Sequence, residues 1–141
     1  MFLGEHRHSL DPKGRVIFPT RYRDELGTQV VVQKANERCL LVWPMAAWQE
    51  IEEKVRSLPT TTDPRARRFA RFFFSQASME RVDGQGRLTI PQPLREYAGL
   101  SRDVVIVAAG NRLEIWNAEA WDTHVSDVEE HVDEFAEQLG I

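Results

Sequence analysis

Leu10-Asp11-Pro12-Lys13-Gly14-Arg15-Val16-Ile17-Phe18-Pro19 is a ten-residue segment that the chain repeats as Val82-Asp83-Gly84-Gln85-Gly86-Arg87-Leu88-Thr89-Ile90-Pro91. The Asp, the Gly before Arg, the Arg itself and the final Pro keep their places in both copies. The residues between Arg and Pro have the character of a short strand each time. An internal duplication constrains the architecture before any single element is assigned, because each copy should form the same local structure.

The repeat continues beyond this segment, since Leu40–Trp43 corresponds to Leu113–Trp116 and Ala47-Trp48 corresponds to Ala120-Trp121. Half-domains of about 50–60 residues are marginally stable alone, so the two halves should pack together or against another chain. We expect a first half with its helix (residues 1–58), a linker with a middle helix (59–77), and a second half with an acidic C-terminal helix (78–141).

Each half is predicted to run as a β-hairpin, a short helix, a second β-hairpin and a longer helix. Asp11 and Gly14 have turn chemistry, because Asp accepts nearby backbone N–H groups and Gly adopts positive φ. Asp83 and Gly86 repeat it. The fold class is therefore α+β and mainly β, with each Arg just beyond a hairpin tip. Four further strands are expected at residues 29–33, 40–43, 103–108 and 113–116.

The C-terminal helix carries an apolar seam with a spacing of four and three residues. Such a seam, with acids on the other faces, predicts one long helix that packs on a partner helix in the same chain or in a neighbour. Its members are Trp121, Val125, Val128, Val132, Phe135 and Leu139.

The middle helix is predicted over residues 64–77, with Asp63 as its N-cap and Pro64 at its first position. Three phenylalanines, Phe69, Phe72 and Phe73, fall on one face and suit a core or a subunit interface. Four arginines lie around the others: Arg65, Arg67, Arg68 and Arg71. This run is open to three interpretations: contact with the acidic tail, simple solvation, or contact with nucleic acid.

Charge is divided unevenly along the chain. The net charge is −4, but all 18 Lys and Arg lie at or before Arg112, and residues 1–112 have a net charge of +5. The remaining acids, from Glu114 to Glu137, lie in a segment without Lys or Arg. A basic body attracts a polyanion whatever the total charge, provided that the acidic segment lies on the far side.

Several classes of protein lack support in the sequence. The only cysteine, Cys39, suits a buried apolar site in a reducing cytosol. No apolar run approaches the ~20 residues of a membrane span, and the N-terminal residues do not resemble a signal peptide. His6 and His8 share a strand face but have no further ligands to complete a metal site. Nucleotide-binding and hydrolase motifs are absent. We expect no enzyme, cofactor, metal or small-molecule substrate.

The repeated Asp and Arg allow three interpretations. Asp11 and Asp83 could form a carboxylate pair like that of two-lobed aspartic proteases, although an Arg four residues beyond each one argues against it. They could instead build their turns and pair with Arg15 and Arg87. The two arginines could also bind nucleic acid, since a guanidinium suits phosphates and guanine edges. Lys13 and Arg7 add charge near the first copy, whereas the second has Gln85, so the first should dominate anion contact.

The two segments resemble the Asp-x-x-x-Arg signatures of the MraZ family of bacterial transcription regulators, which are built from two AbrB-like half-domains. The resemblance runs from Met1–Glu5 through Arg71–Phe74 and the second segment to Asn111–Trp116. It implies an AbrB-like swapped-hairpin barrel with pseudo-two-fold symmetry and flanking helices. It also implies ring-like homo-oligomers that bind repeated promoter elements of division and cell-wall genes, and it assigns DNA contact to Arg15 and Arg87.

The leading interpretation is a cytoplasmic, nucleoid-associated homo-oligomer that binds double-stranded promoter DNA through Arg15, Lys13, Arg7 and Arg87. The alternative is an oligomeric protein-interaction module, in which the arginines are structural and the acidic tail recruits a partner.

Overall fold

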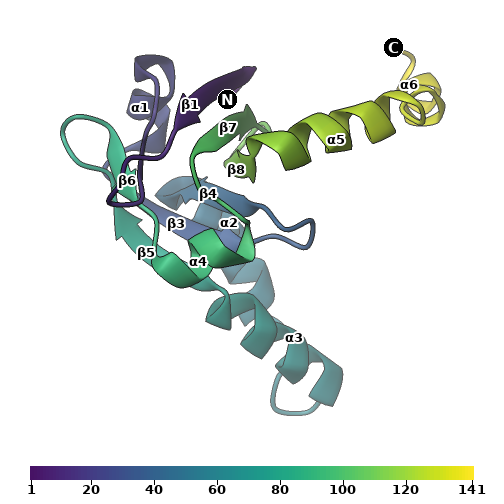
Figure 1. Ribbon diagram of the computed structural model, residues 1–141. Helices are drawn as coiled ribbons and strands as arrows, with labels where there is room; N and C mark the ends of the chain where they lie inside the picture. Colours follow the sequence, from purple (N-terminus) through teal and green to yellow (C-terminus); the bar gives the residue numbers. More distant parts are fainter.

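A computed structural model describes all of residues 1–141, and Figure 1 shows its ribbon. The strands are β1 (Glu5–Ser9), β2 (Arg15–Ile17), β3 (Gln29–Lys34), β4 (Leu40–Pro44), β5 (Ala77–Arg81), β6 (Arg87–Thr89), β7 (Asp103–Ala108) and β8 (Leu113–Asn117). The helices are α1 (Thr20–Leu26), α2 (Met45–Arg56), α3 (Pro64–Ser75), α4 (Gln92–Tyr97), α5 (Ala118–Glu129) and α6 (Asp133–Leu139). The protein is therefore α+β, as predicted, and strands are the more numerous elements.

The strands form one open antiparallel sheet of six strands and one separate pair. The order in the large sheet is β1-β7-β8-β4-β3-β5, and β2 pairs with β6. Strand β1 of the first half pairs with β7 of the second, while β5 of the second half pairs with β3 of the first. The two halves thus exchange a strand each, and neither half forms a sheet of its own.

This exchange corrects the predicted local hairpins at the repeated segments. Strands β1 and β2 flank the first turn but belong to different sheets, and so do β5 and β6 at the second turn. A turn motif specifies the reversal of the chain, but it does not specify which strands pair beyond it. The strands predicted at β3, β4, β7 and β8 form as expected, and they pair locally as β3–β4 and β7–β8.

The core lies between the β2–β6 pair, the short helices α1 and α4, and one face of the large sheet. Val16 and Leu88 from the pair are fully buried against Val30 and Ile106 of the sheet. The alternate residues of β3 and β7 face the other side, where Val31 packs with Trp43 and Trp48 and Val105 packs with Trp116. Both faces of these strands are covered, which explains their continuous apolar sequences.

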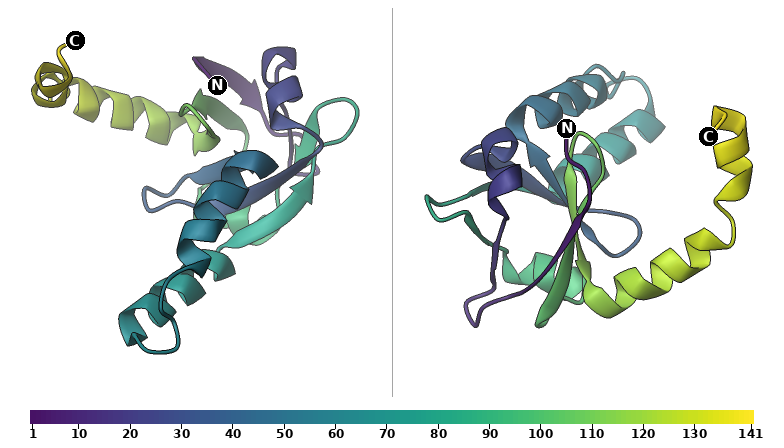
Figure 2. Two further views of the ribbon diagram at one scale, coloured as in Figure 1. Left: turned by 180° about the vertical axis from the view of Figure 1, so that it is seen from behind. Right: turned by 90° about the horizontal axis from the view of Figure 1, so that it is seen from above.

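Helix α3 begins as predicted, since the Asp63 side chain accepts a hydrogen bond from the Arg65 backbone N–H and Pro64 occupies the first turn. The predicted single C-terminal helix is wrong. The helical segment is interrupted between Glu129 and Asp133, which gives two helices, α5 and α6. Its apolar seam is not packed on another helix of the chain. Figure 2 shows α5 and α6 extending from the body with a bend between them. No helix is both long and apolar enough to span a membrane.

Candidate nucleic-acid interface

Strands β2 and β6 bring the two repeated segments together as a two-stranded ribbon. Val16 lies opposite Leu88, Arg15 opposite Thr89, and Ile17 opposite Arg87. The backbone N–H of Phe18 donates to the Gly86 carbonyl at 2.9 Å, and that of Ile90 donates to the Gly14 carbonyl at 3.0 Å. Each strand is therefore fastened to the turn of the other half, and the Val16–Leu88 pair lies at the centre of a pseudo-two-fold arrangement.

The ribbon has one buried and one outer face, because successive side chains of a strand alternate. Val16 and Leu88 point into the core and have no exposed surface. Arg15 and Arg87 lie on the outer face with Ile17 and Thr89, in diagonal positions of the antiparallel pair. The register thus places both signature arginines on one surface.

Each turn is built around its aspartate. One carboxylate oxygen of Asp11 accepts the backbone N–H groups of Lys13 and Arg15, both at 2.9 Å. One oxygen of Asp83 accepts those of Gln85 and Arg87 at the same distance. The hydrogen bond from the backbone of Arg15 is the main cause that lowers the pKa of Asp11, and that of Arg87 likewise lowers the pKa of Asp83. Both carboxylates are therefore ionised at neutral pH.

These pKa shifts oppose the carboxylate-pair interpretation. An aspartic-protease pair needs one carboxyl group whose pKa is raised by its neighbour. Asp11 and Asp83 instead each have a guanidinium beside them and a lowered pKa. The arrangement stabilises two separate anions in two turns.

The aspartates also orient the arginines. The Nε of Arg15 donates to Asp11 at 2.5 Å and that of Arg87 donates to Asp83 at 2.7 Å, while the side chains remain 27% and 30% exposed. No intramolecular hydrogen bond involves the Nη atoms of either arginine. Each guanidinium is thus fixed through one edge and presents its two terminal nitrogens, the fork that binds phosphates and guanine bidentately.

Comparison with known proteins places the chain in a family. The family model described as "MraZ protein, putative antitoxin-like" matches residues 1–72 and again residues 73–139. A protein of Natranaerobius thermophilus called "Transcriptional regulator MraZ" is 47% identical over 99% of this chain and 96% of its own length. A protein of Halothermothrix orenii with the same name is 45% identical over the full length of both. The chain belongs to the MraZ family.

The glycines of the two repeated segments, Gly14 and Gly86, have a further role in the structure. Gly14 and Gly86 have φ of +77° and +78°, and a Cβ on either would collide with a guanidinium from the opposite half. Arg95 of α4 lies over Gly14, and Arg23 of α1 lies over Gly86. Arg23 Nε also donates to the Phe18 carbonyl at 2.9 Å. The two arginines lie at the same spacing after the repeated Asp, and this spacing is the only sign of the contact in the sequence.

The other predicted DNA-contacting residues divide between two places. Lys13 is exposed at the tip of the first turn, beside Arg15. Arg7 instead forms an ion pair with Asp122 of α5 at 2.6 Å and lies near Glu5. Lys13 is thus exposed in the first turn, whereas Arg7 is directed toward the acidic helix.

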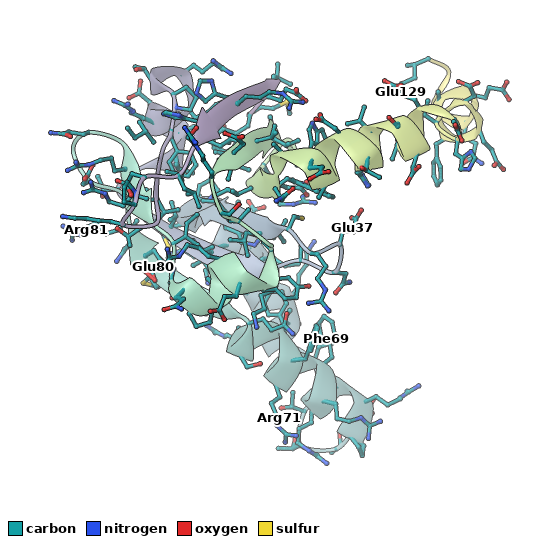
Figure 3. All side chains as sticks on the ribbon, in the orientation of Figure 1. Glu37, Phe69, Arg71, Glu80, Arg81 and Glu129 are labelled. Carbon is teal, nitrogen blue, oxygen red and sulfur yellow. The ribbon has the colours of Figure 1, made fainter.

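The acidic C-terminal helices lie far from the ribbon of this MraZ-family chain. In Figure 1 the turn leading into β6 projects on one side of the body, and α5 and α6 extend from the opposite side. Figure 3 shows Arg81, at the end of β5, projecting on the side of the turns, whereas Glu129 lies on the distant helices. The surface around the ribbon is thus free of the tail's negative charge.

Proposed function

We propose that this protein is a transcription regulator that binds promoter DNA through the outer face of the β2–β6 ribbon. The observation that carries the proposal is the fixed orientation of Arg15 and Arg87 on that face. A two-stranded ribbon fits the major groove of B-DNA, where guanine offers two acceptors to an arginine fork. The names of the relatives, which are transcriptional regulators, support the same role.

The first turn is proposed to make the stronger contact. The aspartate of each turn offsets the charge of its arginine, so the net charge at the tip depends on the residue between them. Arg95 over Gly14 and Arg23 over Gly86 add one positive charge to each turn, so Lys13 gives the first turn one positive charge more than the second, which has Gln85 instead. Arg15 is therefore the chief contact, Lys13 an additional phosphate contact, and Arg87 the weaker counterpart.

We further propose that the protein acts as a ring-like homo-oligomer on repeated elements in promoters of division and cell-wall genes. A ribbon with so few cations should bind one site weakly, because each phosphate contact contributes little. Linked binding modules can add about 10²–10⁴ in avidity. The strand exchange of β1 and β5 also supports the AbrB-like swapped-hairpin fold of the two halves, residues 1–58 and 78–141, joined by 59–77. Such a role belongs in the cytoplasm, at the nucleoid.

Arg15→Ala tests the function directly. Loss of a bidentate base contact costs about 1–3 kcal/mol at each engaged subunit, so the variant should no longer shift its own promoter DNA in a gel assay, with its oligomeric mass unchanged. Arg7→Ala is the matched control and should bind like the wild type, because Arg7 faces Asp122. Unchanged binding by the Arg15 variant would show that the ribbon is not the DNA site.

The alternative of an oligomeric protein-interaction module is favoured by the ion pairs themselves, since Arg15 and Arg87 could serve only their turns. Affinity for promoter and random duplexes at two salt concentrations separates the two functions. DNA binding should weaken as salt rises and should favour the promoter. If neither duplex binds at low salt, the interaction module is the better description.

A further inference from the structure

Helix α3 carries an exposed aromatic face, formed by Phe69 and Phe72. These side chains are 49% and 51% exposed, although Phe73 of the same helix stacks on Trp48. They border a groove of about 400 Å³ that Leu41, Trp43 and Ile51 also line. Arg65 and Arg68 lie four residues before the two phenylalanines, so they stand next to them on the helix surface. The face is apolar, with positive charge along its α3 side, while Glu37 and Glu114 lie on the far wall of the groove.

The bend between α5 and α6 forms a second apolar concavity, which we call the elbow. Its volume is about 370 Å³, and it is lined by His124, Asp127, Val128, His131, Val132 and Phe135. Phe135 is 71% exposed and Leu139, one turn further, is 72% exposed. Residues 118–141 contain eight acids and neither Lys nor Arg. The elbow is apolar with negative charge at its margin.

These two surfaces do not meet within one chain. None of its ion pairs joins an arginine of α3 to the C-terminal helices, and Arg65 pairs only with Asp63. Figure 1 shows α3 and α5–α6 leaving the body in different directions, and Figure 3 shows the labelled Phe69 and Glu129 well apart. The intramolecular contact between the arginine run and the tail, one of the three interpretations from the sequence, is absent from this chain.

We infer that the aromatic face of α3 docks into the α5–α6 elbow of a second copy of this chain. Apolar surface is then covered on both sides, and the arginines of one copy face the acids of the other, which favours this pairing over random contacts. The interface is heterologous, because it joins different surfaces, and repetition of such an interface closes a ring or forms a filament. In Figure 1 the turn leading into β6 projects from a different side of the body than α3 and α5–α6, so the docking leaves the ribbon free. The inference rests on the homo-oligomer in the proposed function but does not depend on DNA binding.

Two full-length variants test the docking. Phe69→Asp/Phe72→Asp blocks α3 and leaves the elbow intact, whereas Phe135→Asp/Leu139→Asp blocks the elbow and leaves α3 intact. All four side chains are exposed, so the fold should be kept, which circular dichroism can verify. Each variant alone should have a lower mass than the wild type in analytical ultracentrifugation. Mixed together, they should form a species with one copy of each, because one interface remains available. Leu3→Asp, at an equally exposed apolar residue, should retain the wild-type mass.

A wild-type protein that is a single chain, variants that keep the wild-type mass, or a mixture that does not associate would each overturn the inference. Arg65→Glu/Arg68→Glu provides a second test that leaves the aromatic side chains in place, and it should weaken association at least tenfold. If the mixed variants fail to associate while the wild type still shifts promoter DNA, only the docking is wrong. If they associate but the wild type does not bind DNA, the proposed function is wrong and the docking stands.

Discussion

The two turns of the ribbon have the same backbone but different charge. Both are organised by a carboxylate that accepts two backbone N–H groups and one arginine Nε, and corresponding hydrogen bonds in the two turns differ in length by at most 0.2 Å. Both contain a glycine with positive φ beneath an arginine of the opposite half. Only the middle of each turn differs, with Pro12-Lys13 in the first and Gly84-Gln85 in the second. The residues shared by the two turns determine the backbone conformation, and the residues that differ determine the charge that each turn presents to a ligand.

The arginines above the glycines provide a second difference. Arg23 is held over Gly86 by a hydrogen bond from its Nε to the Phe18 carbonyl. Arg95, over Gly14, has a buried Nε without a partner. The second turn is thus more firmly supported, while the first carries more positive charge. The first turn is therefore better suited to binding an anionic ligand, and the second to a structural role.

The largest expected effect comes from adding a methyl group at the turn glycines, Gly14 and Gly86. Left-handed backbone costs a residue with a Cβ about 1–2 kcal/mol. Gly14→Ala should lower the free energy of unfolding by that amount, because Arg95 has no side-chain hydrogen bond to lose when the new Cβ pushes it aside. Gly86→Ala should cost about 1 kcal/mol more, because its Cβ also displaces Arg23 from a hydrogen bond. Urea unfolding measures both.

Gly84→Ala is the matched control, since nothing lies near its missing Cβ and its φ is not positive. It should leave the stability unchanged or slightly higher, as expected when the unfolded chain loses freedom. Equal costs at Gly14 and Gly86 would show that Arg23 and Arg95 support the two turns alike.

Much of this arrangement was predictable from the sequence, because it depends on local chemistry. The turns, the cap at Asp63 and the strands β3, β4, β7 and β8 follow from residue types within a few positions of one another. The exchange of β1 and β5 depends on pairing between distant segments, which no short pattern encodes. For the same reason, the packing of Arg23 on Gly86 became visible only when the two halves were seen together.

The C-terminal seam shows a different limit of sequence analysis. The spacing from Trp121 to Leu139 suits one continuous helix, yet the chain ends α5 at Glu129. Periodicity records where apolar side chains recur, but it does not show whether the intervening backbone stays helical. Glu129, Glu130, Asp133 and Glu134 concentrate negative charge at the break, and like charges three or four residues apart disfavour a helix.

The charge difference between the turns should appear as a moderate change in the salt dependence of DNA binding. Lys13→Gln makes the first turn resemble the second, and each lost phosphate contact reduces the slope of log affinity against log salt by about 0.9. Gln85→Lys should increase that slope by a similar amount if the second tip also faces a phosphate. Fluorescence anisotropy with one promoter duplex at several salt concentrations measures both slopes. Identical slopes for Lys13→Gln and the wild type would exclude Lys13 from phosphate contact.

The smallest expected effect is the loss of stability in acid that each turn causes. In this effect the two turns should agree. The pKa values of Asp11 and Asp83 are lowered in the folded protein, chiefly by backbone N–H groups, so the unfolded state binds more protons near pH 4. The stabilisation that the two ionised carboxylates give the folded protein is therefore complete at neutral pH. It is lost as the pH falls below about 4 and through the folded-state pKa values. Asp11→Asn and Asp83→Asn should each flatten the fall of unfolding free energy with acid, measured by urea unfolding between about pH 5 and pH 2.5. Because the two carboxylates accept hydrogen bonds from equivalent groups of their turns, the reductions should match. If the unfolding free energy of one variant falls with acid as steeply as that of the wild type, the aspartate of that turn does not keep its hydrogen bonds in acid. The two turns would then differ in stability as well as in charge.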